Sequence, residues 1–239
     1  VVALHESDVI AFTGTSRVLL AFCHALLLLL PLLALLATGQ TVNQARAEGS
    51  LELLLSNPFS RLSYFSALAL VRFSMLALPL LLLLLSLGLG SAIAGQGLEV
   101  LLLLRCLAVT LSLLLCFTGL GLWVATAVTN PARAAMVLLL VWLLSVAFLD
   151  FALAGLMLQW QIEPRVVFVL AALNPVQAAR MALLSALQPD LAILGPVGFY
   201  LANRVGSGVL TLLGIAWPAL LGLSAWWSAL RRFEREDLI

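Results

Sequence analysis

The chain contains no lysine, and all twelve of its basic residues are arginine. A Walker A phosphate loop needs a lysine on the β- and γ-phosphates, and Schiff-base catalysis needs a lysine amine. The absence of lysine therefore excludes P-loop hydrolysis of ATP and lysine imine chemistry by this chain. Any nucleotide chemistry has to come from a partner.

Charge is also scarce, because charged residues make up only 10% of the 239 residues and hydrophobic residues make up 64%. Soluble domains usually carry about 25% charged residues. Apolar runs such as Ala25 to Leu36, Leu76 to Leu89 and Ala134 to Leu149 are too many and too long for one soluble core of this length. The composition predicts a protein embedded in a lipid bilayer, and the net charge of +1 argues against nucleic acid as a partner.

Side chains that could bind metals or catalyse reactions are few. The two histidines, His5 and His24, lie at no ligand spacing on one element, either with each other or with the methionines. All cysteines fall in apolar stretches, where a thiol behaves as a small hydrophobe. They are Cys23, Cys106 and Cys116. We therefore predict no disulfide framework, no metal site and no catalytic residue.

About 20 apolar residues are needed to cross the hydrocarbon core of a bilayer. Five stretches meet this requirement and predict five membrane-spanning helices: Val18 to Leu36, Ala67 to Leu89, Val100 to Ala127, Ala134 to Leu158 and Val209 to Trp227. The predicted fold class is all-α, a polytopic transmembrane helix bundle that forms a single domain over residues 1–239.

A shorter apolar piece, Val166 to Leu173, cannot cross the bilayer and ends at Asn174-Pro175, where the residue before proline is pushed out of helical geometry. A second short piece, Ala178 to Leu187, follows and is closed by Pro189. The two pieces predict a re-entrant or interfacial hairpin on the outer face, within residues 159–208.

The positions of the arginines predict the orientation of the chain. If the loop from Gly39 to Ser66 is cytoplasmic, six arginines lie on that side and four on the other. The six are Arg46, Arg61, Arg133, Arg231, Arg232 and Arg235. The last three follow the interfacial pair Trp226-Trp227, so we expect a cytoplasmic C-terminus. Five spans then leave Val1 outside, and we expect one further N-terminal span in the complete protein.

The loop between the first and second spans has an amphipathic pattern. At helical spacing its apolar face consists of Val42, Ala45, Gly49 and Leu53, and its polar face of Gln44, Arg46, Glu48 and Glu52. Glu48 and Glu52 stand one turn apart, and Pro58 ends any helix near Asn57. An ordinary interfacial loop would show the same amphipathic pattern.

The order of residues in this loop resembles the cytoplasmic segment E-R-E-x-G-T-L-E-x-L-L-x-x-P-x-S-R of ABC-2 type permeases. The matching residues are Arg46, Gly49, Leu51, Glu52, Leu54, Leu55, Pro58, Ser60 and Arg61, with Ser50 in place of threonine. Ala45 and Ala47 replace the two flanking glutamates. The resemblance implies that residues 37–66 form a cytoplasmic segment that docks on an ATPase subunit. The implied ATPase-coupling residues are Arg46, Glu48, Gly49, Leu51, Glu52, Pro58 and Arg61.

Within the ABC-2 group, other segments resemble the permease of the nitrous oxide reductase maturation system, the NosY type. They are Trp142 to Asp150, Leu173-Asn174-Pro175 with Arg180, the Gly195-Pro196 turn, and Arg231 to Leu238. This resemblance implies a bacterial inner-membrane permease that supports assembly of the copper centres of nitrous oxide reductase. The implied partners are a separate ABC ATPase, which binds ATP-Mg, and a periplasmic accessory protein. The chain itself is expected to bind no cofactor and to be no enzyme.

One set of six spans is half a transporter, so we expect a homodimer with two ATPase copies. The cargo stays open between copper, a sulfur species and, outside this subfamily, a drug or lipid. Two alternatives are transmission of ATPase motion to a periplasmic partner without any cargo, and a non-transporting membrane scaffold. The few polar residues in the predicted spans favour transmission, or a small or apolar cargo.

Asp150 is the only carboxylate deep in a predicted span. An acid inside a membrane is a functional candidate because an unpaired charge there is expensive. A structural pair or a protonated acid that holds the bundle to the hairpin is the alternative. Asn174, Pro175 and Arg180 are further intramembrane or outer-face candidates.

Overall fold

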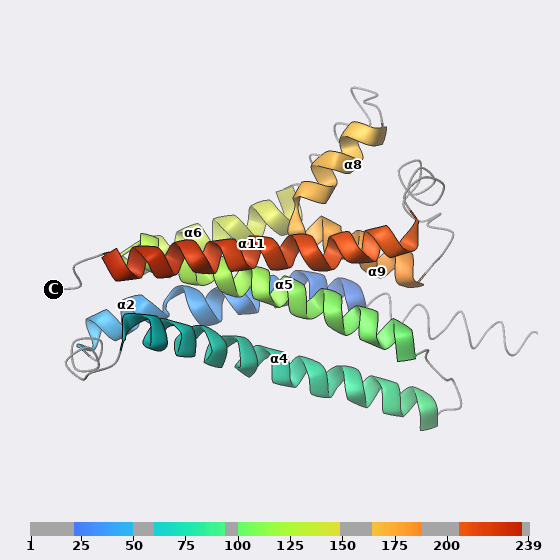
Figure 1. Ribbon diagram of the computed structural model, residues 1–239, viewed down its shortest axis with the longest axis horizontal. Coiled ribbons are helices and arrows are strands. Elements are labelled where there is room, and N and C mark those ends of the chain that lie inside the picture. The colour runs from blue at the N-terminus through green and yellow to red at the C-terminus, as the bar shows by residue number, and fades with distance from the viewer. Residues whose placement is uncertain (1–21, 50–59, 94–99, 149–163, 188–205, 236–239) are drawn as a thin grey trace, which may run out of the picture.

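A computed structural model describes residues 22–49, 60–93, 100–148, 164–187 and 206–235 (Figure 1). The regular structure in these residues is entirely helical, and no strand occurs among them. Five stretches of helix are long and apolar enough to cross a membrane: Phe22–Ala45, Arg61–Ile93, Val100–Ala127, Pro131–Phe148 and Gly208–Arg235. The prediction of an all-α bundle with five spans is confirmed.

The third predicted span coincides with helix α5, Val100–Ala127. Helix α4, Arg61–Ile93, and helix α11, Ser207–Arg235, extend beyond the predicted spans at both ends. The prediction followed the apolar runs alone, whereas an α-helix continues wherever its backbone groups can pair.

The first and fourth predicted spans are described in part. The first continues as helix past Leu36 to residue 39, and a turn at Gln40 leads into helix α2, Thr41–Ala47. The fourth consists of α6, Pro131–Leu143, followed by a π-helical segment η1, Leu144–Phe148. Residues 149–158 of that span lie outside the described residues.

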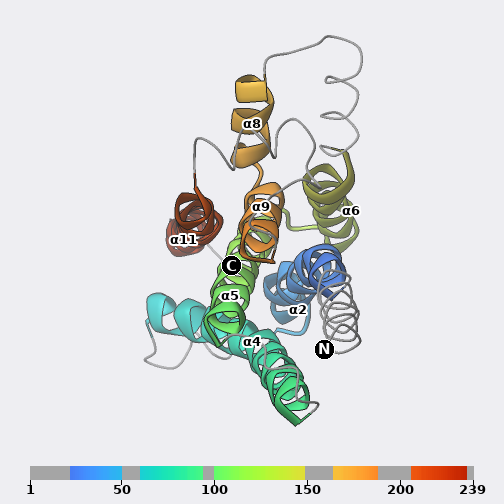
Figure 2. The ribbon, with the colours of Figure 1, turned by 90° about the vertical axis from the view of Figure 1, so that its right-hand side faces the viewer.

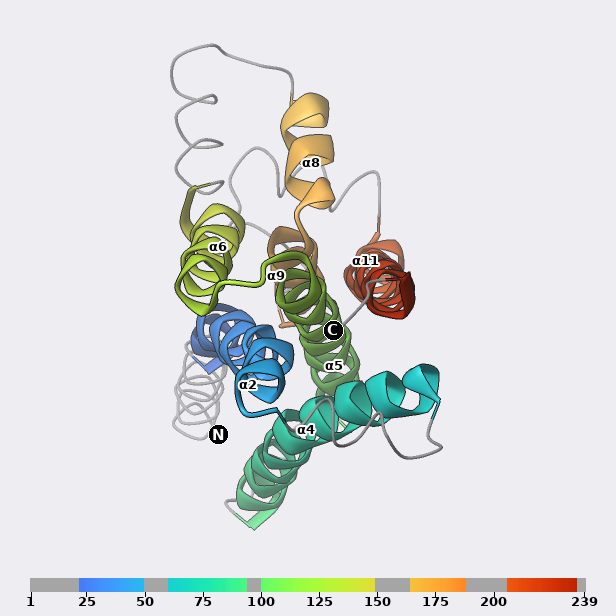
Figure 3. The same ribbon diagram turned by 90° about the vertical axis from the view of Figure 1, so that its left-hand side faces the viewer.

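Helix α5 occupies the centre of the bundle. Figures 2 and 3 look along the bundle and show α11, α9, α6, the helix of residues 22–39 and the obliquely running α4 arranged around α5. Fifteen of the 28 residues of α5 are buried, whereas α4 buries only Phe65, Leu80 and Leu84. The α4 helix therefore lies at the edge of the bundle and presents most of its surface outward.

Two glycines bring α5 and α11 into close contact. A methyl group on Gly119 would collide with the backbone oxygen of Gly222, and a methyl group on Gly222 would lie 2.6 Å from the backbone oxygen of Leu115. Neither position can carry a side chain unless the helices move apart. Small residues at such crossings let membrane helices gain contact where the hydrophobic effect contributes little.

Three of the membrane helices contain an interior proline: Pro31 in residues 22–39, Pro79 in α4 and Pro218 in α11. Proline lacks an N–H and disturbs the carbonyls of the preceding turn. Before Pro31 and before Pro218, the carbonyl three residues earlier accepts a bond from a neighbouring helix, as expected where no water can do so. The two bonds run from Trp142 Nε1 to Leu28 O (3.1 Å) and from Ser112 Oγ to Ile215 O.

Candidate functional site

Five elements meet at one end of the bundle, which we term the α2 end. It is formed by α2, the first turns of α4 and α6, and the last turns of α5 and α11, and it lies at the left of Figure 1 beside the C-terminus. The elements that carry the six arginines of the predicted cytoplasmic set all reach this end. The assignment of this end to the cytoplasm stays a prediction.

An aromatic cluster holds the α2 end together. Phe233 of α11 is fully buried, and its ring centroid lies 5.1 Å from that of Phe65 and 6.1 Å from that of Tyr64, both on α4. Residues from α2, α5 and α11 complete the cluster: Val42, Leu122, Ala125, Ala229 and Leu230. A single apolar core therefore joins α2 to the start of α4 and the end of α11.

Arg61 adds a polar connection between α4 and α11. Its Nη1 donates a hydrogen bond of 3.0 Å to the backbone oxygen of Glu234, in the last turn of α11, where carbonyls have no partner within the helix. The preceding residue, Ser60, accepts a bond of 3.1 Å from the backbone N of Ser63 and thereby caps the start of α4. Arg61, one of the predicted coupling residues, thus links the start of one membrane helix to the end of another.

Helix α2 is fixed to the core by two neighbouring residues. Val42 is fully buried, as its predicted place on the apolar face requires. Asn43 is also buried, and its Nδ2 donates a bond of 2.8 Å to the backbone oxygen of Val128, just past the end of α5. The prediction missed Asn43, because a polar side chain beside an apolar stripe gives no sign of a distant carbonyl.

The predicted helical spacing does not continue unbroken through Gly49, and Leu53 lies outside the described residues. The helix ends at Ala47, and Gly49 has a φ of 67°, a left-handed conformation that commonly terminates helices and that glycine adopts at low cost. The backbone N of Glu48 still bonds to the oxygen of Gln44, at 3.0 Å, and the Glu48 side chain is exposed. Leu51, Glu52 and Pro58 lie outside the described residues, as does the side chain of Arg46.

The break predicted at Asn174-Pro175 is present. Helix α8, Pro164–Leu173, ends there, and helix α9, Pro175–Leu187, begins three residues before the predicted second piece. Asn174 Oδ1 accepts from the backbone N of Val176 (3.0 Å) and caps α9, where proline at the first helical position is favourable. The prediction placed the start of α9 three residues too late, because Pro175 opens this helix as well as following the end of α8. The placement of the hairpin on the outer face stays a prediction.

Side chains from two directions fix the junction between α8 and α9. Asn174 Nδ2 donates to the backbone oxygen of Ser145 (2.6 Å), within the π-helical segment η1, and Trp217 Nε1 of α11 donates to the backbone oxygen of Leu173 (2.9 Å). Helix α9 packs against α5 and α11 inside the bundle, while α8 points away from it (Figure 1). Asn174 is therefore a joint between three elements.

The other residues considered as functional candidates are Arg180, Asp150, the cysteines and possible metal ligands. Arg180 lies on α9 and is half-buried, and Asp150 lies outside the described residues. The three cysteines are buried free thiols. Among the residues whose structure is described, no group of three His, Cys, Asp or Glu side chains could hold a metal ion.

A family model described as "ABC-2 family transporter protein" matches residues 6–238, nearly the whole chain. No curated protein matches the chain. Proteins of this family are multi-pass membrane subunits of transporters and are generally non-catalytic, because the ATPase is a separate chain. The protein therefore belongs to the ABC-2 transporter family, as a membrane permease subunit that works with an ABC ATPase.

Proposed function

We propose that the ABC ATPase docks on the α2 end, which thereby acts as the coupling site of this permease. The observation that carries the proposal is the bond from Arg61 to the backbone oxygen of Glu234. Arg61 closes the segment whose residue order resembles the coupling segment of ABC-2 permeases. A partner that pushes on this segment would act directly on the last turn of α11.

The packing supports transmission of such a push through the bundle. Helix α11 runs beside α5 with Gly119 and Gly222 in contact, and it also packs against α9. The aromatic cluster around Phe233 joins α2, α4, α5 and α11 at the end where the ATPase would bind. Closure of the ATPases on ATP-Mg would then move α4 and α11 together, as a rigid-body switch biased by nucleotide.

The working unit in this proposal contains two permease copies and two ATPase copies, in the inner membrane of a bacterium and with the C-terminus in the cytoplasm. A two-fold assembly buries the same surface on both copies. The support within the chain is the outward surface of α4, which the described residues leave largely uncovered.

The narrower role that we propose is support for the assembly of the copper centres of nitrous oxide reductase, by export of a small species or by transmission of motion to a periplasmic partner. Its support is the sequence resemblance. Trp142 and Asn174 belong to the segments that resemble that permease, and both form hydrogen bonds between helices. A role in folding accounts for these two residues without any role in copper-centre assembly.

The coupling proposal is tested by co-purification. Arg61→Ala removes the link to α11, and we expect the affinity-tagged permease to retain clearly less of its ABC ATPase, or to lose the stimulation of ATP hydrolysis. The matched control is Arg105→Ala, the same change near the start of α5, at the end of that helix opposite the α2 end. Equal ATPase binding and equal hydrolysis rates in the two variants would contradict the proposed site.

The narrower role has a separate test. In a denitrifying host whose own maturation permease has been deleted, expression of this protein with its ATPase should restore the copper content of purified nitrous oxide reductase. A reductase that stays copper-free, although the permease and the ATPase assemble, would refute the maturation role and leave the coupling proposal intact.

A further inference from the structure

One face of α11 changes along its length from apolar to aromatic to charged. Leu220 and Leu223 are 61% and 49% exposed, and Trp227, one turn further on, is 48% exposed. Arg231 follows after one more turn and is also exposed. Side chains at intervals of three or four residues lie on the same face of a helix. This face of a membrane-spanning helix is therefore open to lipid along its side and ends in a positive charge.

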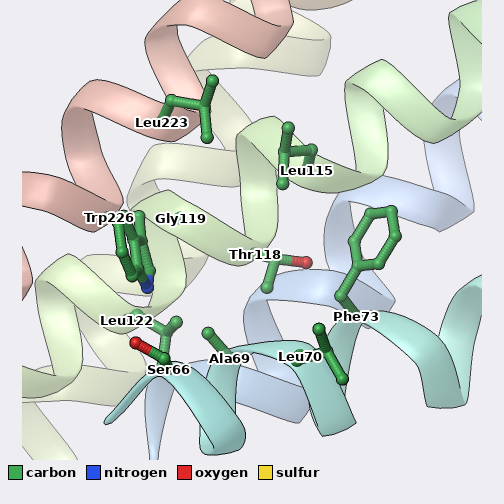
Figure 4. Close-up of a pocket in the computed structure, with 10 residues that line it drawn as sticks. All are labelled: Ser66, Ala69, Leu70, Phe73, Leu115, Thr118, Gly119, Leu122, Leu223 and Trp226. Carbon is green, nitrogen blue, oxygen red and sulfur yellow. The ribbon is translucent and has the colours of Figure 1, made fainter. Parts of the chain in front are cut away.

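The two neighbouring tryptophans of α11 have different surroundings. Trp226 lines the cavity between α4, α5 and α11, beside Gly119 and Leu122 (Figure 4), and its indole nitrogen is buried. Trp227 lies on the outward face, with about half of its surface exposed. Exposed tryptophans of membrane helices lie at the boundary between the hydrocarbon and the headgroups, where the indole N–H can bond to lipid esters. Trp227 therefore marks the depth of the ester groups on this face.

The side chain of Arg231 is held in place by Trp227. Its Cζ lies 4.9 Å from the centroid of the Trp227 ring, and tryptophan forms the strongest cation–π contacts of the aromatic side chains. The ring covers one face of the guanidinium and leaves the edge, which carries the N–H donors, open. No carboxylate among the described residues forms an ion pair with Arg231. A planar fork of donors held in this way fits a phosphate group, which accepts two parallel hydrogen bonds from arginine.

Glu234 adds a negative charge next to Arg231. It is exposed and lies three residues further on, a spacing that brings side chains together on a helix surface. Arg61 bonds to the backbone oxygen of Glu234 and fixes this turn, while no ion pair of the Glu234 carboxylate occurs in the described part of the chain. Arg235 points about 100° further round the helix. Because the last carbonyls of a helix also carry negative partial charge, a cation is favoured beside Glu234.

We propose that this face of α11 binds phosphatidylethanolamine, with the lipid phosphate on Arg231 and the primary ammonium on Glu234. An acyl chain lies along Leu220 and Leu223. Along the helix, Arg231 lies about 6 Å and Glu234 about 10 Å beyond Trp227. The order of ester, phosphate and ammonium in the lipid thus matches the order of Trp227, Arg231 and Glu234.

The pair of opposite charges makes the face selective among phospholipids. Phosphatidylglycerol has the phosphate but no ammonium for Glu234. Phosphatidylcholine has a quaternary nitrogen, which has no N–H to donate to a carboxylate. A merely basic face would instead prefer the lipid with the largest negative charge. The expected preference for phosphatidylethanolamine therefore separates a headgroup site from general attraction between arginines and an anionic membrane.

The test uses the full-length permease, freed of lipid in detergent and titrated with one lipid at a time. Bound lipid is counted by native mass spectrometry. The lipids are phosphatidylethanolamine, phosphatidylcholine and phosphatidylglycerol with the same acyl chains. We expect the first phosphatidylethanolamine to bind about threefold more tightly than the first phosphatidylcholine or phosphatidylglycerol, the effect of one exposed ion pair.

Three variants of exposed side chains assign the headgroup contacts. Glu234→Gln should abolish the preference for phosphatidylethanolamine over phosphatidylcholine. Arg231→Gln should weaken binding of all three lipids about fivefold, as expected for one arginine near a lipid phosphate. Trp227→Leu should also weaken binding of all three, because it frees the guanidinium. Arg133→Gln, the same change at an exposed arginine in the first turn of α6, is the control and should change nothing.

Equal affinities of the native permease for the three lipids would overturn the proposal. A preference for phosphatidylglycerol that Glu234→Gln leaves unchanged would overturn it as well, because a basic surface alone would then account for the binding. The coupling proposal would survive either result, since co-purification of the ATPase does not depend on which lipid lies beside α11.

Discussion

Replacement of Phe233 by alanine tests the packing of the α2 end most severely. Phe233 is fully buried, and its ring contacts Phe65 and Tyr64 across the gap between α11 and α4. Removal of a buried phenylalanine side chain from a packed core costs about 3–5 kcal/mol, and an aromatic pair adds about 0.5–1.5 kcal/mol beyond its buried area. Because this cluster lies near the end of the bundle and can partly collapse, we expect Phe233→Ala to cost about 3 kcal/mol.

The free energy of unfolding can be measured by titration of the purified protein with sodium dodecyl sulfate in mixed micelles. Phe148→Ala is the matched control, since Phe148 is 58% exposed, and we expect a change within about 0.5 kcal/mol. A double-mutant cycle with Phe65→Ala should show a coupling energy of about 0.5–3 kcal/mol. If Phe233→Ala costs no more than Phe148→Ala, or if the cycle shows no coupling, the described packing of the α2 end is wrong.

Two further predictions concern the joints of the bundle. Gly119→Ala should destabilise the protein by about 1–3 kcal/mol in the same titration, because its methyl group would push α11 away. Gly90→Ala is the control and should leave the stability unchanged, because a methyl group there would meet no atom within 4 Å. Equal stability of the two variants would contradict the close crossing of α5 and α11. Asn174→Ala should cost about 1–3 kcal/mol through loss of the cap of α9 and of the bond to Ser145. Asn174→Ser keeps a neutral cap acceptor but loses the amide donor to Ser145, so its stability should lie between that of the alanine variant and that of the native protein. A serine variant no more stable than the alanine variant would contradict the contribution of the cap.

The sequence was sufficient to predict those features that depend on local chemistry. Lipid requires long apolar runs, so hydropathy located five spans and the bounds of α5. Proline restricts the residue before it, so the break at Asn174 was also predictable. Glycine commonly follows the end of a helix, so Gly49 in the sequence is a signal for the end of α2, and the structure places it there in a left-handed conformation.

Features that join distant segments could not be predicted. The contact of Gly119 with Gly222 and the bond from Asn43 to Val128 bring together residues far apart in the chain. The sequence likewise could not show that α9 lies inside the bundle, because a short apolar helix has the same composition whether it faces lipid or protein. The link from Arg61 to α11 needed the structure for the same reason.

The central claim, that the ABC ATPase docks on the α2 end, is tested most directly by cross-linking from single cysteines. Glu48, exposed just after α2, and Ile93, 88% exposed at the far end of α4, are each changed to cysteine and labelled with benzophenone maleimide, while the three native cysteines are buried. The account predicts that, after illumination of the assembled complex, Glu48→Cys forms a cross-link to the ATPase and Ile93→Cys does not. Cross-linking from Ile93→Cys, with none from Glu48→Cys, would contradict it.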